Sequence, residues 1–173
     1  MPTRCAGCGA VFPDMEGPTH AYMQSSPACF AAFTKLLAAE YSSAALRSVH
    51  RLTVDTWAVQ HPGSAEDRRA IQSVGLHLAR LMLQLERPGS PMQTNAVMLD
   101  FSHYKGTLRR LAPPEAFRVT VAEVVDFAGT PSHADKVRQW AETTWEGYAE
   151  HHEYIRRWID DGPDEGRSSK GCE

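Results

Sequence analysis

Apolar residues recur every three to four positions along much of the chain. In the stretch PACFAAFTKLLAAEY they fall at Phe30, Phe33 and Leu37, the spacing of one face of a helix. Ser26 and Pro27 precede this stretch, and these residue types are favoured at the N-cap and in the first turn. By the same criteria we expect five helices, which cover residues 27–41, 43–60, 64–87, 120–127 and 132–161.

The remaining stretches lack this periodicity. Residues 1–25 are rich in glycine and proline, which predicts an irregular, turn-rich segment. The motif RPGSPMQTN, residues 87–95, predicts a loop, and residues 101–111 form either a short helix or an irregular link. The polar tail, residues 162–173, is expected to be disordered because it has nothing to bury.

The fold that follows is all-α. We expect one domain over residues 1–161, a helical bundle of four to six helices, with a small irregular N-terminal zinc knuckle at residues 5–29. A length of 173 residues with 42% hydrophobic residues suffices for one core.

Charge and hydropathy narrow the classes of function. The net charge is −3, and no basic face is visible, which argues against nucleic acid as a partner. No run of eighteen apolar residues exists, so we expect no membrane span. The N-terminus lacks the order of a secretory signal, and a cytoplasmic protein is expected.

The N-terminal cysteines predict a metal site. Cys5 and Cys8 form a Cys-x2-Cys pair, Cys29 lies at the start of the first expected helix, and His20 lies between them. Three thiolates and an imidazole are a typical ligand set for structural zinc. The alternatives are free thiols or a redox pair like that of thioredoxin, which needs a strand before the pair and a helix after it. We expect Cys5, Cys8, His20 and Cys29 to bind zinc.

Histidines on the helices suggest a second site. His50, His77 and His152 lie on or beside apolar stripes of three expected helices, and a buried imidazole needs a partner. That partner is either an ordinary hydrogen-bonding group or a second divalent metal ion that the three histidines share. His61 is about 16 Å along the helix from His50, too far to share its ion.

Several motifs carry a resemblance to known families. CAGCG, GPTHAY, SPACF, HRLTVDTWAVQHPG and WEGYAEHHEYIRRWI together resemble an uncharacterised bacterial family, which implies a cysteine knuckle with helices and no assigned activity. A looser similarity is to DinB-type, mycothiol-transferase-like bundles, which bind one metal through three histidines. His50 and His152 would match two of these, but the usual later pair, four residues apart, is missing.

Two functions remain open. The first is a metal-dependent enzyme acting on a small molecule at His50, His77 and His152, with Asp55 or His61 as the general base or as an orienting group. The second is a zinc-stabilised interaction or regulatory module without chemistry. The enzyme is favoured, because several imidazoles on facing helices are a costly way to build a core.

Overall fold

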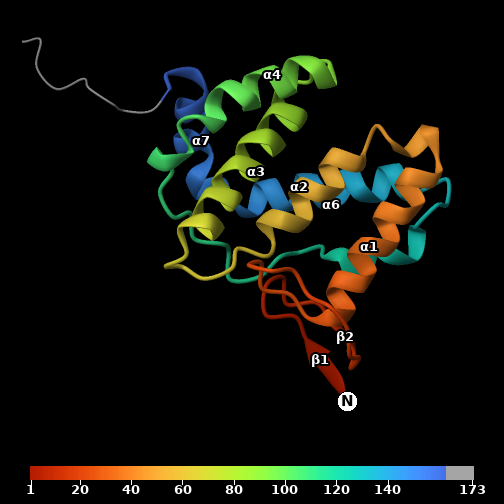
Figure 1. Cartoon of the computed structure of the whole chain (residues 1–173). Helices are drawn as coiled ribbons and strands as arrows, with labels where there is room; N and C mark the ends of the chain where they lie inside the picture. The colour runs from red at the N-terminus through yellow and green to blue at the C-terminus, as the bar shows by residue number, and fades with distance from the viewer. Residues whose placement is uncertain (163–173) are drawn as a thin grey trace, which may run out of the picture.

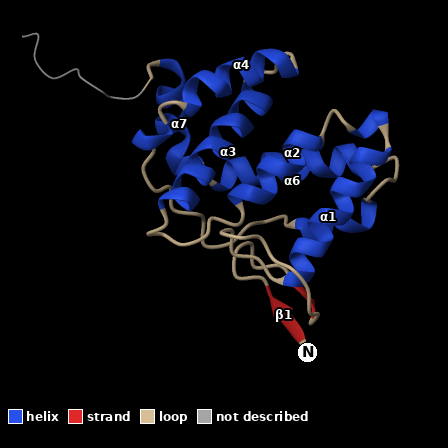
Figure 2. Cartoon of the chain, in the orientation of Figure 1, coloured by secondary structure: helices blue, strands red, loops and turns tan. Residues whose placement is uncertain are grey.

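The computed structural model describes residues 1–162 and is mostly helical (Figures 1 and 2). Within these residues lie seven α-helices rather than the four to six expected, together with a small two-stranded hairpin. The α-helices are α1 (Pro27–Ser42), α2 (His50–Val59), α3 (Arg68–Glu86), α4 (Pro91–Ser102), α5 (Val121–Val124), α6 (His133–Gly147) and α7 (His152–Asp160). The expected tail from residue 163 onward, which includes Cys172, lies outside the described residues.

Helix α1 begins where the sequence predicted. The Ser26 side chain accepts a hydrogen bond from the backbone N–H of Cys29 at 3.2 Å, and Pro27 takes the first helical position. A serine cap satisfies one of the N–H groups that a helix start leaves without a partner. The cap therefore fixes the backbone of Cys29 in the first turn of α1.

Helix α2 is the centre of the fold. Seven of its ten residues are buried, and it contacts α1, α3 and α6, as Figure 1 shows. Its largest side chain, Trp57, stacks on Phe33 of α1 with ring centroids 4.4 Å apart. The core continues through Leu78 of α3 and Trp140 of α6, both fully buried. The packed core therefore fixes the position of the residues at the ends of α2.

Three expected elements differ in the structure. The helix expected over residues 43–60 is divided into a short 3₁₀ turn (Ala44–Leu46) and α2. The predicted loop at residues 87–95 contains the start of α4, because Ser90 and Gln93 form a reciprocal capping box. The third helix begins after Asp67, which caps it, rather than after Ser64.

The long helix expected over residues 132–161 is broken. Helix α6 ends at Gly147, a 3₁₀ turn (Ala149–His151) follows, and α7 continues the chain. The break allows the Tyr148 hydroxyl to donate to the Val59 carbonyl oxygen at 2.6 Å. A side chain at Gly147 would lie 3.3 Å from Pro114, so the chain also packs closely there. Tertiary contacts therefore override the helical pattern at this point.

The N-terminal segment contains a hairpin where the sequence predicted irregular structure. Strand β1 (Pro2–Arg4) pairs antiparallel with β2 (Val11–Pro13), with Arg4 opposite Val11. Both strands are largely exposed, and the hairpin lies below the helices, next to the first turn of α1 (Figure 1). The loop that joins the strands carries Cys5 and Cys8 inward. None of the helices in residues 1–162 is long and apolar enough to span a membrane.

Candidate metal centre

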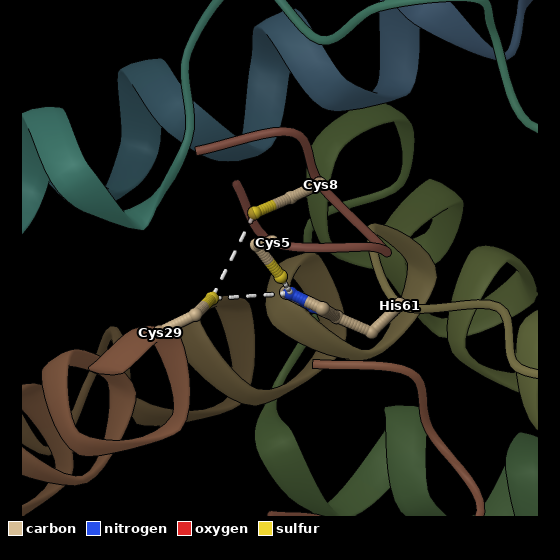
Figure 3. Close-up of side chains that lie close together, drawn as sticks. All are labelled: Cys5, Cys8, Cys29 and His61. Atoms are coloured by element: carbon tan, nitrogen blue, oxygen red, sulfur yellow. Dashed lines mark hydrogen bonds between the residues drawn. The ribbon is translucent and has the colours of Figure 1, made fainter. Parts of the chain in front are cut away.

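Four side chains meet between the hairpin loop and the helices (Figure 3). Their ligand atoms all lie within 4.8 Å of one another, and all four residues are buried: Cys5, Cys8, Cys29 and His61. The Nε2 atom of His61 is 3.2 Å from the Cys29 sulfur and 3.4 Å from the Cys5 sulfur. The sulfurs of Cys8 and Cys29 are 3.7 Å apart. Within residues 1–162, this is the one group of three or more such side chains close enough to share an ion.

These separations fit a tetrahedral zinc ion. With Zn–S bonds of about 2.3 Å and a Zn–N bond of about 2.0 Å, tetrahedral geometry places two sulfurs about 3.7 Å apart and a sulfur and a nitrogen about 3.5 Å apart. The observed contacts of 3.7, 3.4 and 3.2 Å match this pattern. Four protein ligands also complete the coordination shell of a structural zinc site. The arrangement is therefore compatible with zinc bound by Cys5, Cys8, Cys29 and His61.

The hairpin loop is a knuckle that directs two sulfurs to one point. The backbone N–H of Cys5 donates to the Ala10 carbonyl at 2.8 Å, and the N–H of Gly9 donates to the Cys5 carbonyl at 3.0 Å. Gly9 has a φ of 78°, a left-handed conformation that glycine adopts at little cost. The backbone of Cys8 helps to lower the pKa of the Cys5 thiol, which favours the thiolate form that a metal needs.

His61 is oriented by the end of α2. Its Nδ1 atom is 2.6 Å from the carbonyl oxygen of Trp57, so Nδ1 carries the proton and donates it. In a neutral imidazole this leaves the lone pair on Nε2, the atom that faces the sulfurs. The ring also stacks on Trp57 with centroids 4.1 Å apart. A backbone carbonyl that holds the second nitrogen of a histidine is typical of metal ligands.

The thiols of the cluster influence one another strongly. A hydrogen bond from Cys29 holds the pKa of the Cys5 thiol far below its usual range. The hydrogen bond to Cys5, together with burial, raises the pKa of the Cys29 thiol. One thiolate is thus stabilised at the expense of its neighbours, because several negative charges cannot be buried together without a cation. A divalent ion would remove this conflict and release protons as it binds.

Gly7 permits the close approach of the knuckle to His61. A Cβ atom at this position would lie 2.3 Å from the Gln24 carbonyl oxygen and 2.5 Å from Cδ2 of His61. Neither the backbone oxygen nor the packed ring can move away freely. A glycine is therefore required for steric reasons between the two cysteines.

Replacing this glycine should weaken the site. Gly7→Ala is expected to lower the affinity for Zn²⁺ by roughly tenfold to a hundredfold, the range for groups that orient metal ligands. Gly17→Ala is the matched control, because a Cβ atom there would meet its nearest neighbour at an ordinary 3.7 Å. Competition with a chromophoric chelator measures both affinities, and equal values for the two variants would contradict the steric explanation.

The expected ligand His20 lies outside this group. Its Nδ1 atom accepts hydrogen bonds from the backbone N–H groups of Met23 and Tyr22, at 3.3 and 3.5 Å. Its ring packs edge-on against Tyr22 with centroids 4.7 Å apart. Local backbone contacts thus occupy His20, and His61 stands in its place among the cysteines. The sequence suggests His61 as a general base or an orienting group instead. The HPG motif after α2 is the one local signal that the position of His61 is fixed.

The three histidines of the expected second site do not come together. His50 donates from Nδ1 toward Glu40 at 2.8 Å, and His77 does the same toward Asp55 at 2.7 Å. The Nε2 atom of His152 is 2.8 Å from the Trp145 carbonyl oxygen. Each imidazole therefore has its own partner, and within residues 1–162 the three form no shared ligand group.

Asp55, the other expected catalytic residue, belongs to a buried ion pair. It is fully buried, and both of its oxygens lie 2.8 Å from Nε of Arg80. Gln84 donates to the same carboxylate at 2.7 Å. The contact with Asp55 raises the pKa of Arg80 against the opposing effect of its burial. Asp55 orients His77 and neutralises Arg80, so it has no free oxygen position for proton transfer.

A second buried carboxylate joins three helices. Glu40 of α1 is fully buried, and its Oε1 atom accepts hydrogen bonds from the Thr53 hydroxyl of α2 and from Nε2 of His133 at 3.0 Å. The Nδ1 atom of His133 accepts from the Gly129 N–H at 3.0 Å, so its proton is on Nε2. With His50 on the other oxygen, Glu40 has three donors, which satisfies it in the core.

Comparisons with known proteins add a family but no activity. The model of DUF5946, a family of unknown function, matches residues 3–149, a stretch that contains all four residues of the metal-binding group. The resemblance to a family without assigned activity is confirmed, whereas no finding supports a likeness to DinB-type bundles. No curated protein and no solved structure matches the chain. Because the family model covers most of its length, the chain belongs to DUF5946, a family of unknown function.

Proposed function

We propose that this protein binds one structural Zn²⁺ ion through Cys5, Cys8, Cys29 and His61. The observation that carries the proposal is the convergence of these four buried side chains, with ligand atoms within 4.8 Å of one another. The ion would carry the compensating charge that three neighbouring thiolates need. It would complete its shell with protein ligands alone, which is the pattern of structural rather than catalytic zinc.

The proposed ligands come from three separate segments of the chain, so a bound ion would link these segments. Two belong to the hairpin loop, Cys29 belongs to α1, and His61 lies two residues after Val59, the last residue of α2. The hairpin strands bury little surface of their own. Zinc would therefore link the N-terminal segment to α1 and to the end of α2, next to strands that are themselves largely exposed.

Between the two functions inferred from the sequence, the contacts favour the zinc-stabilised module. The enzyme hypothesis required His50, His77 and His152 to share an ion, but Glu40, Asp55 and the Trp145 carbonyl engage them separately. A half-buried histidine whose ring is already hydrogen-bonded needs no metal ion to satisfy it. We propose a non-catalytic, zinc-stabilised module as the function that the geometry supports best.

Metal analysis of the purified protein tests the proposal. One zinc ion per chain is expected after loading and removal of free metal, and His61→Ala should reduce this content sharply. The matched control is His20→Ala, which removes the neighbouring imidazole that lies outside the group and should leave the content unchanged. Loss of zinc in the His20 variant, or full retention in the His61 variant, would overturn the assignment.

A further inference from the structure

One side of the cysteine cluster faces a pocket. A cavity of about 590 Å³ lies between the knuckle and the segment of residues 114–123, and Cys5 and Cys8 are among the residues that line it. The opposite wall includes Phe117 and Thr120. Cys29 and His61 do not line this cavity, and Cys29 is fully buried. In this wall Cys8 is 4% exposed and Cys5 is 1% exposed, so a small solute in the cavity can reach only the outer edge of the cluster, at Cys8.

The sulfurs are arranged as a pair with unequal access. Cys8 lines the pocket, and its sulfur is 3.7 Å from that of Cys29, which lies behind it. A disulfide needs the sulfurs at about 2.05 Å, so a movement of less than about 2 Å would join them. Zinc-bound cysteines remain thiolates, the form that reacts with oxidants.

We propose that Cys8 is a site of oxidation by hydroperoxides and that Cys29 then closes a disulfide with it. This inference rests on the proposed zinc site. In the first step the Cys8 thiolate attacks one oxygen of hydrogen peroxide, the O–O bond breaks, and Cys8 becomes a sulfenic acid while hydroxide leaves. In the second step the Cys29 thiolate attacks the Cys8 sulfur, the S–S bond forms, and a second hydroxide leaves. Two electrons pass from the two sulfurs to the peroxide.

Oxidation would replace the zinc ligation of the N-terminal segment by a disulfide. Cys5 and His61 alone remain as ligands, too few for a stable structural zinc site, and the ion leaves. The new covalent bond connects the knuckle to α1, whereas the link to α2 through His61 is lost. Peroxide would thus remove the zinc-dependent attachment of the N-terminal segment, and a thiol reductant would restore it by reducing the disulfide.

The experiment uses the zinc-loaded full chain in a Cys172→Ser background, so that only the three cluster cysteines react. Hydrogen peroxide is added while a chromophoric chelator reports released zinc, and peptide mapping then locates the disulfide. We expect release of one zinc per chain, a disulfide between Cys8 and Cys29, and recovery of zinc binding after reduction.

A matched pair of variants tests the route of access. Ala116 is exposed and lines the pocket, whereas Ala112 is exposed and does not line it. Ala116→Trp should slow zinc release by peroxide several-fold, and Ala112→Trp should leave the rate unchanged, while both variants bind zinc as the parent protein does.

The outcomes separate the two proposals. A chain that binds no zinc would overturn the proposed function and this inference with it. A chain that binds zinc but keeps it in peroxide would overturn this inference alone. A disulfide that involves Cys5, or equal release rates for the two tryptophan variants, would equally overturn the assignment of Cys8 as the reactive residue and of the pocket as its access route.

Discussion

Removal of zinc is expected to lower the free energy of unfolding by about 5 kcal/mol, the value that linkage gives when free zinc exceeds its dissociation constant ten-thousandfold. The physical reason is that the four ligands are brought together only in the folded chain, so binding energy becomes folding energy. Urea unfolding followed by circular dichroism, with and without zinc after exhaustive chelation, measures the difference.

The effect should be largest in the N-terminal segment. Amide hydrogen exchange is expected to become fast in residues 1–25 of the zinc-free protein, while the buried amides of α2 and α3 stay slower and lose no more protection than the drop in the free energy of unfolding. Cys29→Ser should reproduce the effect of chelation, and Ser102→Ala, a change at the half-buried last residue of α4, is the control. Identical unfolding curves with and without zinc would show that the ion has no structural role.

Loss of the Glu40 carboxylate is expected to be the most damaging change outside the metal site. Glu40→Ala leaves the fully buried His133 and the Thr53 hydroxyl without their acceptor. Removing one partner from a buried charged network costs about 3–5 kcal/mol. Chemical denaturation of the variant measures the change in the free energy of unfolding.

Two further variants make this prediction specific. Glu40→Gln keeps an acceptor oxygen for His133 and should cost less than Glu40→Ala. Glu142→Ala removes an exposed carboxylate of α6 and should change stability by less than about 0.5 kcal/mol, as surface substitutions usually do. If all three variants unfold alike, the hydrogen bonds around Glu40 do not contribute to stability.

The sequence predicted the parts of the structure that local rules determine. The Ser26–Pro27 start of α1 and the capping box of Thr120 and Glu123 appear as expected, because a helix start depends on a few adjacent residues. The meeting of Cys5 and Cys8 also follows from their short spacing, and Cys29 joins them as the sequence predicts. Ser90 and Gln93 carry the same kind of signal, but Pro88 and Gly89 beside them obscured it.

The rest depends on tertiary packing. His20 and His61 are equally suitable metal ligands by residue type. Only His61 faces the cysteines, because the Trp57 carbonyl orients its ring and Gly7 fits closely beside it. The break after Gly147 is fixed by the hydrogen bond from Tyr148 to Val59. No periodicity in one chain segment reveals such a contact, because the partner lies far away in sequence.

His61 lies two residues beyond α2, the helix at the centre of the core, so the proposed zinc affinity would depend on how well the interior is packed. A substitution that tilts α2, even one remote from the sulfurs, would shift the imidazole and weaken the proposed binding of zinc. During synthesis the chain can assemble three ligands early but must wait for the fourth until residue 61 has emerged and α2 has docked. Acquisition of zinc would then mark the moment at which the first third of the chain has packed correctly.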